Sequence, residues 1–243
     1  MQGANLYAPD DFEEKVNALV ARRIEGEPIA YIIGEWEFYG LPVKVNQNVL
    51  IPRTDTEVLV DAALTVLKKK PDSRVLDLCS GSGCVGIALA ANVPSCRVIM
   101  VDNSAKALSV CRENILLNGL TRAITCVQAD ACEPPPMLLG RFDMIICNPP
   151  YISTEELAKL DASVREYEPA SALDGGEDGL DFYREIASKW GVALKENGQL
   201  LFECGAGQAE EVKNIMLVNG FGDIKIFKDT LDIDRVVMGT LAG

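Results

Sequence analysis

An apolar run stops abruptly at two prolines in residues 143–152, Asp143-Met144-Ile145-Ile146-Cys147-Asn148-Pro149-Pro150-Tyr151-Ile152. Four consecutive apolar residues, 144–147, are typical of a strand in a parallel sheet that is covered on both faces. Proline has no N–H and favours extended geometry in the residue before it, so the strand cannot run on into a helix. It ends instead in hydrogen-bond acceptors, the side-chain oxygen of Asn148 and the carbonyls of Asn148 and Pro149. These acceptors suit a planar amide or NH2 group, although Asn148 to Tyr151 are equally compatible with a simple turn.

Strands and helices alternate on both sides of this run. The predicted strands are 74–78, 96–101, 124–127, 143–147, 199–204, 221–227 and 235–240. The predicted helices are 84–91, 105–117, 181–194 and 208–218. This alternation indicates βαβ units and therefore an α/β fold around a parallel sheet. The polar stretch from 151 to about 179 is longer than most connections, which favours a functional or lid-like loop.

The first seventy residues follow a different pattern. Helical spacing of apolar residues predicts a helix over 10–23 with an aspartate as its cap. Short strands are predicted at 36–39 and 43–45, on either side of a turn that contains Gly40. A second helix is predicted from Thr54 or Asp55, either of which could cap it, to Lys69.

Composition narrows the class of protein. Of the 243 residues, 48% are hydrophobic, and no 18-residue apolar run or secretory signal is present, so we expect a cytoplasmic protein that does not enter a membrane. The net charge of −13 argues against duplex nucleic acid as the main partner, because that binding depends on Lys and Arg. The chain has no histidine and no CxxC pair, so we expect reduced cysteines, no metal site and catalysis by positioning or carboxylates.

A glycine-rich loop follows the first predicted strand of the alternating region, Asp77-Leu78-Cys79-Ser80-Gly81-Ser82-Gly83. Gly81 and Gly83 allow a sharp turn and a close approach of a ligand to the start of the next helix. Asp102 and Asp130 stand at the ends of the next two strands, where ligands of α/β proteins bind. We expect Asp102 to accept hydrogen bonds from ribose hydroxyls and Asp130 from an adenine amine. An aspartate after a strand is also a common cap or turn residue.

The glycine-rich loop is compatible with two classes of ligand. Gly81-x-Gly83-x-x-Gly86 matches the dinucleotide fingerprint, with Asp102 about 20 residues further on. A nicotinamide dehydrogenase would use that loop but has no need of an acceptor rim after the fourth strand. A methyltransferase that uses S-adenosylmethionine needs an adenosine site after the first three strands and an acceptor site after the fourth, which is the order seen here.

Further motifs narrow the family. They are Pro28-Ile29-Ala30-Tyr31-Ile32-Ile33-Gly34-Glu35-Trp36-Glu37-Phe38, Leu50-Ile51-Pro52-Arg53-Thr54-Asp55-Thr56-Glu57, Glu168-Pro169 and Ala172-Leu173-Asp174-Gly175-Gly176-Glu177-Asp178-Gly179-Leu180. With residues 77–83 and 148–151, they resemble the HemK-type protein-(glutamine-N5) methyltransferases, from about Pro28 to Val236. Cys79 stands where the family usually has glycine, and Thr54 where proline is common.

The resemblance implies a fold and a division of the chain. The fold would be a Rossmann-like class I S-adenosylmethionine-dependent methyltransferase. It would have a mostly parallel seven-stranded sheet with helices on both faces, plus a short N-terminal helix and a β-hairpin. Residues 55–243 would form the methyltransferase domain and 28–54 a helix and β-hairpin linker. Residues 1–27 would be the remnant of a helical domain that is longer in the family, as in a truncated or short-form member.

The resemblance also implies an activity and its residues. The methyl group would pass from S-adenosylmethionine, leaving S-adenosylhomocysteine, to the glutamine side-chain amide in the Gly-Gly-Gln loop of a peptide chain release factor. The implied catalytic residues are Asn148, Pro149, Pro150 and Tyr151. The implied cofactor-binding residues are Asp77, Ser80, Gly81, Gly83, Asp102, Asn103, Asp130, Ala131 and Asn148. The implied substrate-binding residues are Asn148, Pro149, Tyr151, Leu50, Arg53 and Glu168.

Three alternatives stay open from the residues. An adenine amine in DNA or RNA is also planar and conjugated, so it fits the same acceptor rim, although base extrusion would call for a basic groove. A glutamine of a ribosomal protein would present the same amide. A non-catalytic module that binds adenosine or a dinucleotide would need only the glycine-rich loop and the acidic strand ends.

Overall fold

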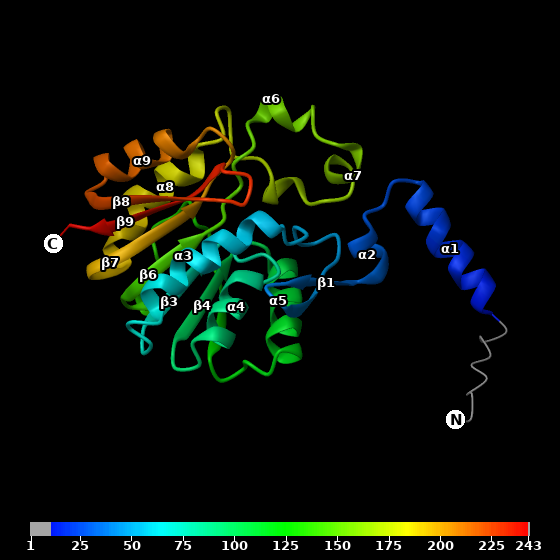
Figure 1. The fold of residues 1–243 in the computed structure, drawn as a ribbon, viewed down its shortest axis with the longest axis horizontal. Helices are drawn as coiled ribbons and strands as arrows, with labels where there is room; N and C mark the ends of the chain where they lie inside the picture. Colours follow the sequence, from blue (N-terminus) through cyan, green and yellow to red (C-terminus); the bar gives the residue numbers. More distant parts are fainter. Residues whose placement is uncertain (1–10, 243) are drawn as a thin grey trace.

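A mixed sheet forms the centre of the molecule (Figure 1). The computed structural model describes residues 11–242. Residues 1–9 and Asp10, the first residue of the predicted helix, lie outside the described residues. Asp11, which precedes the observed first helix, makes no side-chain capping hydrogen bond. The strands of the large sheet are β3 (Arg74–Leu78), β4 (Arg97–Asp102), β5 (Ile124–Gln128), β6 (Phe142–Cys147), β7 (Leu194–Glu203), β8 (Phe221–Lys228) and β9 (Asp234–Leu241). Their bounds lie close to the predicted ones except at the start of β7.

The strand order in this seven-stranded sheet of the described chain is β5-β4-β3-β6-β7-β9-β8. Neighbours from β5 to β7 run parallel, and β9 is antiparallel to both β7 and β8. The order reverses between β3 and β6, so the chain leaves β3 in one direction across the sheet and returns to β6. The cleft for a ligand in such a sheet lies at the carboxyl ends of the strands where this reversal occurs.

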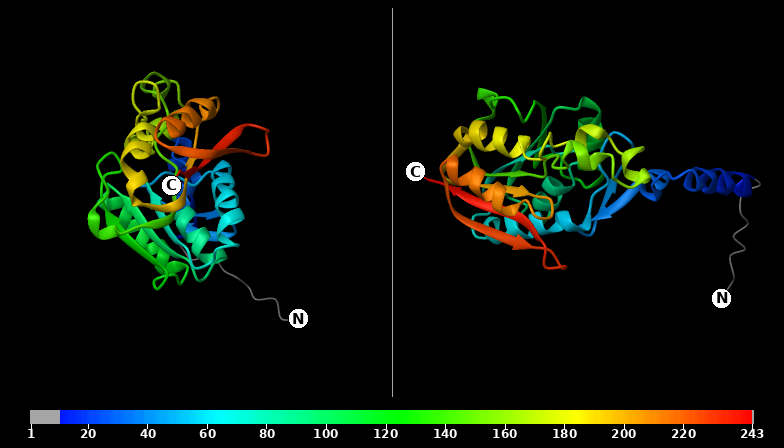
Figure 2. Two further views of the ribbon diagram at one scale, coloured as in Figure 1. Left: turned by 90° about the vertical axis from the view of Figure 1, so that its left-hand side faces the viewer. Right: turned by 90° about the horizontal axis from the view of Figure 1, so that it is seen from above.

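Helices cover both faces of the sheet (Figures 1 and 2). One face carries α3 (Glu57–Leu67), α4 (Cys84–Asn92) and α5 (Ala105–Leu117); the other carries α8 (Asp181–Trp190) and α9 (Ala209–Val218). Strand β6 contributes to both cores because side chains alternate along a strand. Met144 and Ile146 pack in the core with α3 to α5, whereas Ile145 and Cys147 pack in the core with α8 and α9. This explains why its sequence is apolar without a break.

Two predicted boundaries are wrong. Neither Thr54 nor Asp55 caps α3, because Thr54–Thr56 form a 3-10 turn and the α-helix begins at Glu57 without a side-chain cap. Helix α8 ends at Trp190, and a 3-10 turn at Gly191–Ala193 leads into β7 at Leu194, earlier than predicted. The polar residues 195–198 resemble a turn, but they lie within the strand beside an irregularity in its pairing with β6.

The N-terminal segment has a helical and a hairpin part. Helix α1 (Phe12–Ile24) has no buried residue and projects away from the body of the molecule (Figures 1 and 2). It is followed by α2 (Ile29–Ile33) and the antiparallel hairpin of β1 (Glu35–Phe38) and β2 (Leu41–Lys44). The buried Asn114 of α5 exchanges hydrogen bonds with the backbone of Lys44 and donates to the Ser82 carbonyl at 2.9 Å. The hairpin is thereby fixed to the glycine-rich loop.

The long polar connection, residues 152–180, is named the rim loop here. It contains α6 (Thr154–Leu157), α7 (Ala162–Arg165) and a 3-10 turn at Ala170–Ala172. A parallel bridge between Ile152 and Asp174 closes most of it into a ring. The Ile152 N–H donates to Leu173 at 3.0 Å, and the Gly175 N–H donates back to Ile152 at 2.9 Å. The rim loop is therefore ordered by backbone hydrogen bonds at its base.

Within residues 11–242, no helix is long and apolar enough to cross a membrane. The same residues contain no cluster of His, Cys, Asp and Glu with the arrangement of a metal site.

Candidate active site

A cavity lies at the carboxyl ends of β3, β4, β5 and β6. Its walls come from the glycine-rich loop, from the residues that follow β4, β5 and β6, and from residues 48–53 and 169–172. Small-molecule ligands of open α/β sheets bind in a crevice at this place. The cavity therefore occupies the place that the strand order predicts for a ligand.

The glycine-rich loop turns through left-handed backbone. Cys79, Gly81 and Gly83 have φ values of 56°, 52° and 81°. A β-carbon on Gly83 would lie 2.7 Å from the sulfur of Cys111, so packing restricts this position to glycine. Gly81 lines the cavity and has open space beside its α-carbon. Cys79 takes up the left-handed region with a full side chain, at a cost of about 1 kcal/mol.

Ser80 and Asp102 make this part of the cavity suitable for a ligand rich in hydroxyl and amine groups. The Ser80 hydroxyl is buried, lines the cavity and has no hydrogen-bond partner among residues 11–242. An unpartnered buried hydroxyl costs free energy that a bound ligand can recover. The Asp102 oxygens accept from the Gly81 N–H at 2.8 Å and the Ser104 N–H at 2.9 Å. A carboxylate oxygen can accept a second hydrogen bond, so these residues fit the adenosine part of S-adenosylmethionine.

The other two predicted acids differ in their positions. Asp130 lines the cavity, and its carboxylate accepts from the Cys132 N–H at 2.8 Å. Asp77 lies behind the glycine-rich loop, where its carboxylate accepts from the Gly86 N–H at 3.0 Å. Burial raises the pKa of Asp77 to about 7. Asp77 thus supports the loop and the start of α4 from behind.

The cavity brings many of the predicted site residues together. Those that line it are Ser80, Gly81, Asp102, Asn103, Asp130, Ala131, Asn148, Pro150, Leu50 and Arg53. Those that lie outside its lining are Asp77, Gly83, Pro149, Tyr151 and Glu168. Pro149 is buried one residue beyond Asn148. Tyr151 instead lines a second, more open hollow between the rim loop and the start of α9.

Asn148 is the first residue after β6 and forms part of the cavity wall. Its side-chain NH2 donates to the Thr56 hydroxyl at 3.2 Å. Thr56 belongs to the 3-10 turn before α3 and also lines the cavity. An amide has a donor end and an acceptor end. With the donor end directed at Thr56, the oxygen of Asn148 is left for a ligand.

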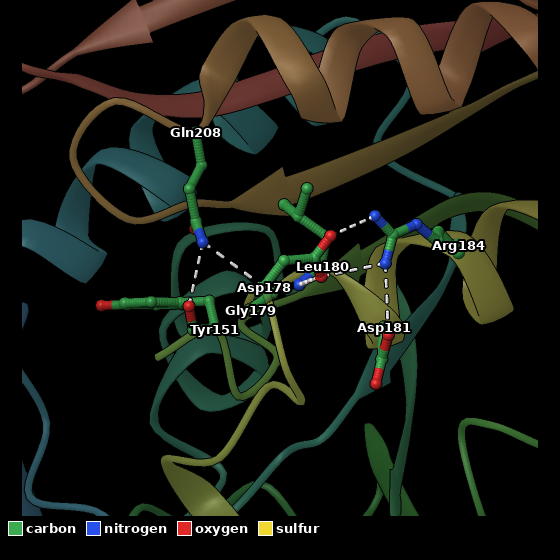
Figure 3. Close-up of polar contacts among 7 residues, drawn as sticks. All are labelled: Tyr151, Asp178, Gly179, Leu180, Asp181, Arg184 and Gln208. Carbon is green, nitrogen blue, oxygen red and sulfur yellow. Dashed lines mark hydrogen bonds and ion pairs between the residues drawn. The ribbon is translucent and has the colours of Figure 1, made fainter. Parts of the chain in front are cut away.

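Gln208 holds the backbone that follows Asn148 and the two prolines. Its side-chain NH2 donates to the Tyr151 carbonyl at 2.9 Å and to the Gly179 carbonyl at 3.4 Å (Figure 3). Its oxygen accepts from the Gly205 N–H. A β-carbon on Gly175 would lie 2.8 Å from the Pro150 carbonyl. The Pro-Pro-Tyr backbone is therefore packed tightly against the end of the rim loop.

Arg184 orders the same end of the rim loop from α8. Its guanidinium pairs with Asp178 at 2.5 Å and with Asp181 at 3.2 Å (Figure 3). The Asp178 carboxylate also accepts from the Leu180 N–H at 3.1 Å. Both ion pairs are exposed, so they define a local turn and add little to stability.

Sequence reasoning missed the surroundings of Asn148. Thr56 and Glu203 are both buried beside it, and neither was expected to have a role at the site. Glu203 ends β7 after an apolar run, Leu200-Leu201-Phe202. A charged residue at the end of a buried strand was the signal that could have identified it, because a buried carboxylate needs a reason to be there.

The chain matches one domain family and a set of curated relatives. Residues 55–165 match the methyltransferase small domain. A release factor glutamine methyltransferase of Thermodesulfovibrio yellowstonii is 42% identical over 225 residues, which cover 92% of this chain and 80% of the relative. The protein of the same name from Geobacter sulfurreducens is 45% identical over 226 residues, which cover 92% and 76%. The crystal structure of a methyltransferase from Pyrococcus furiosus aligns with 93% of this chain and 100% of its own, at a TM-score of 0.60 and 16% identity.

The matched methyltransferase domain and the fold shared with the Pyrococcus furiosus structure place the protein among the class I methyltransferases that depend on S-adenosylmethionine. The predicted fold class is confirmed. Within that class, the identity to curated relatives over nine-tenths of the chain is decisive. The chain belongs to the release factor glutamine methyltransferase family, as the resemblance of its motifs predicted.

Proposed function

We propose that this protein transfers the methyl group of S-adenosylmethionine to the side-chain amide nitrogen of the glutamine in the Gly-Gly-Gln loop of a peptide chain release factor. The names of the relatives support this substrate. The observation that carries the proposal is that Asn148, whose NH2 is directed at Thr56, lines the same cavity as Ser80, Gly81 and Asp102. The reaction would take place in the cytoplasm, where release factors act. The relatives' names do not favour an adenine acceptor.

We propose that the cavity holds the cofactor through the residues that follow β3, β4 and β5. Asp102 accepts from the ribose hydroxyls with its remaining lone pairs, and Asp130 accepts from the adenine amine. Ser80 gains a polar partner in the ligand. When bound, S-adenosylmethionine supplies a methyl group made electrophilic by its attachment to a positively charged sulfur.

A carboxamide nitrogen is a poor nucleophile because its lone pair is shared with the carbonyl. Asn148 counteracts this by accepting one N–H of the glutamine amide, and the Pro149 carbonyl is the proposed acceptor of the other. The nitrogen is then oriented, and the positive charge that develops on it meets acceptors already in place. No base is needed before transfer, since the methylated amide cation loses its proton readily to water. This agrees with a chain that has no histidine.

The opposite wall of the cavity completes the acceptor site in this proposal. Leu50 and Pro52 line that wall, and Arg53 lies beside them. Apolar side chains there would exclude water from the glutamine amide, which strengthens its hydrogen bonds to the rim. Tyr151 and Pro150 would define the outer edge, where the release factor enters.

The test is methylation of a purified release factor. The protein, S-adenosylmethionine and the release factor are incubated together, and the peptide that contains the Gly-Gly-Gln loop is analysed by mass spectrometry. The expected result is the mass increase of one methyl group on the glutamine, and no increase in a release factor whose glutamine is replaced by alanine. An unmodified glutamine, with cofactor binding shown by calorimetry, would reject the proposal.

A further inference from the structure

Asn148 can serve as an acceptor only if its amide group is turned the right way. Its oxygen and its NH2 are nearly equal in size, so packing alone does not choose between the two orientations. Hydrogen-bond partners must choose. The choice matters for the proposed function, because the reversed orientation would present donors to the donor groups of the substrate.

Sheet geometry places a carboxylate next to this amide. The register that pairs Cys147 with Phe202 brings the next residues, Asn148 and Glu203, to adjacent strand ends. Side chains alternate along a strand, so Asn148 and Glu203 lie on the same face as Ile146 and Leu201. Those two residues pack in the core with α3. Both polar side chains are thus directed toward the turn that precedes α3.

Thr56 of that turn connects the two residues. It is 3% exposed, and its hydroxyl accepts from the Asn148 NH2 at 3.2 Å. A hydroxyl that accepts one hydrogen bond can still donate its own proton. The Glu203 carboxylate lies near enough for a hydrogen bond from Thr56 to lower its pKa, and β7 packs against α3, which begins directly after this turn. Thr56 therefore lies between the two groups: its hydroxyl accepts from the Asn148 amide and is placed to donate to the Glu203 carboxylate.

Burying the Glu203 carboxylate in this position costs free energy. It is 2% exposed, and one of its oxygens has no hydrogen-bond partner among the described residues. Its backbone is held in place as well, since the buried Tyr183 hydroxyl donates to its carbonyl at 3.0 Å. A buried carboxylate with a free oxygen adds no stability by itself. Such a group is retained where its charge acts on a neighbour.

We propose that Glu203 and Thr56 are positioning residues that fix the orientation of the Asn148 amide, with its NH2 toward them and its oxygen toward the acceptor nitrogen. A carboxylate only accepts hydrogen bonds, so ionised Glu203 requires both Thr56 and Asn148 to donate in its direction. This inference rests on the proposed function, because it explains how that function's acceptor group is oriented.

Protonation gives the arrangement a pH dependence. Burial raises the pKa of Glu203 to about 7, while Thr56 and Asn148, as donors, and the charge of Arg235 limit the rise. A protonated Glu203 can donate to Thr56, and this direction of the hydrogen bonds is then lost. The ionisable groups that face Glu203 are Arg235, Asp55, Tyr151, Tyr183, Cys84 and Cys204. We expect kcat to rise with pH through about 7 as Glu203 becomes ionised.

The experiment compares Thr56→Val, Thr56→Ser and Glu203→Gln with the wild type, in methyl transfer to a release factor. Valine keeps the shape of Thr56 without the hydroxyl, and serine restores the hydroxyl. Matched controls lie at the far end of the strands. Ser73→Ala removes a buried hydroxyl that donates to the Lys70 carbonyl at 2.6 Å, and Asp143→Asn neutralises a buried carboxylate at the start of β6. Melting temperature and the Kd of S-adenosylmethionine are measured for every variant.

We expect Thr56→Val and Glu203→Gln to lower kcat by about tenfold or more, the effect of one lost hydrogen bond in the transition state. Thr56→Ser should retain most of the activity, and the Kd of S-adenosylmethionine should stay within about twofold, since the cofactor contacts are untouched. The rise of kcat with pH should disappear in Glu203→Gln but persist in Asp143→Asn. Burial also raises the pKa of Asp77 to about 7. If Asp77 caused the rise of kcat with pH, the rise would persist in Glu203→Gln.

Each outcome has one meaning. A wild type that methylates the release factor, together with a fully active Thr56→Val or Glu203→Gln, overturns the positioning role and leaves the proposed function standing. Equal losses in the variants and in the Ser73→Ala and Asp143→Asn controls show a structural role only and also overturn it. A wild type that leaves the glutamine unmodified overturns both. Loss of kcat in Thr56→Val with recovery in Thr56→Ser supports it.

Discussion

The Arg53 guanidinium donates to the Glu168 carboxylate at 2.5 Å and so joins two walls of the cavity that are 115 residues apart in sequence. Glu168 is 5% exposed and also accepts from the Ile51 N–H at 3.1 Å. The residues it holds, 51–53, include Pro52 and Arg53 of the cavity lining. Glu168 therefore acts through Arg53 and the backbone, and we infer that it sets the distance between the rim loop and the opposite wall.

Replacement of Glu168 by alanine tests this bridge. The variant should bind S-adenosylmethionine more weakly by about 1–2 kcal/mol, because the wall at 50–53 loses a buried hydrogen-bonded partner. Calorimetry measures the change. Glu166→Ala is the matched control, since Glu166 lies in the same loop, is exposed and, within residues 11–242, forms an ion pair only with its neighbour Arg165. Equal affinities of the Glu168 and Glu166 variants would show that the bridge does not shape the cavity.

Asp102→Ala should weaken the binding of S-adenosylmethionine by about 1–3 kcal/mol, the value of hydrogen bonds to a charged acceptor. The loss has two sources, the proposed ribose contacts and the hydrogen bond that the Gly81 N–H donates to Asp102. Adenosine retains the ribose and lacks the methionine part, so an equal loss in the Kd of adenosine would place the effect in the adenosine half of the site. Glu113→Ala, an exposed acid on α5, is the control. An unchanged Kd in Asp102→Ala would make the ribose assignment wrong.

Asp143, at the opposite end of β6 from Asn148, should make stability depend on pH. Burial alone would raise its pKa, but hydrogen bonds from Lys195, Lys70 and the Arg74 backbone lower the pKa to about 2. A carboxyl group whose pKa is depressed on folding stabilises the fold above its unfolded pKa, and this stabilisation is lost as pH falls from about 4 to about 2. Asp143→Asn should therefore lower the free energy of unfolding by about 2 kcal/mol at pH 7.

Urea unfolding at pH 7 and at pH 3 measures this difference, which should shrink at the lower pH. Asp232→Asn is the control for a surface ion pair, because Asp232 is exposed and pairs with Lys228. It should change the free energy of unfolding by about 0–1 kcal/mol. A difference for Asp143→Asn that is the same at both pH values would contradict the depressed pKa.

The local pattern of apolar and polar residues was sufficient to predict much of the fold. Strand β3 and helix α5 have the predicted bounds, and β6 begins only one residue earlier than predicted, because each is an uninterrupted periodic segment with clear breaks around it. The start of α3 was mispredicted because Thr54 and Asp55 are good caps by type, yet the chain makes a 3-10 turn there. That turn brings Thr56 to Asn148, and no local pattern contains this contact.

The site was predictable where it follows single strand ends and unpredictable where it depends on pairs of distant segments. Asp102 ends a strand, Asn148 directly follows one and Asp130 lies two residues beyond one, so their place at one sheet edge follows from the alternation. The positions of Pro149 and Tyr151 outside the cavity lining depend on how Gly175 of the rim loop packs against the backbone of Pro150 and Tyr151. Glu203 required the register between β6 and β7 before it could be placed beside Asn148.

Methyl transfer by Asn148→Ala is the most direct test of the proposed acceptor site. Turnover on the Gly-Gly-Gln glutamine of a release factor is measured by peptide mass, with the Kd of S-adenosylmethionine determined by calorimetry on the same preparation. We expect most turnover to be lost while the Kd stays nearly unchanged, because the Asn148 oxygen acts on the acceptor nitrogen in the transition state. Wild-type turnover in Asn148→Ala would show that another group orients the amide.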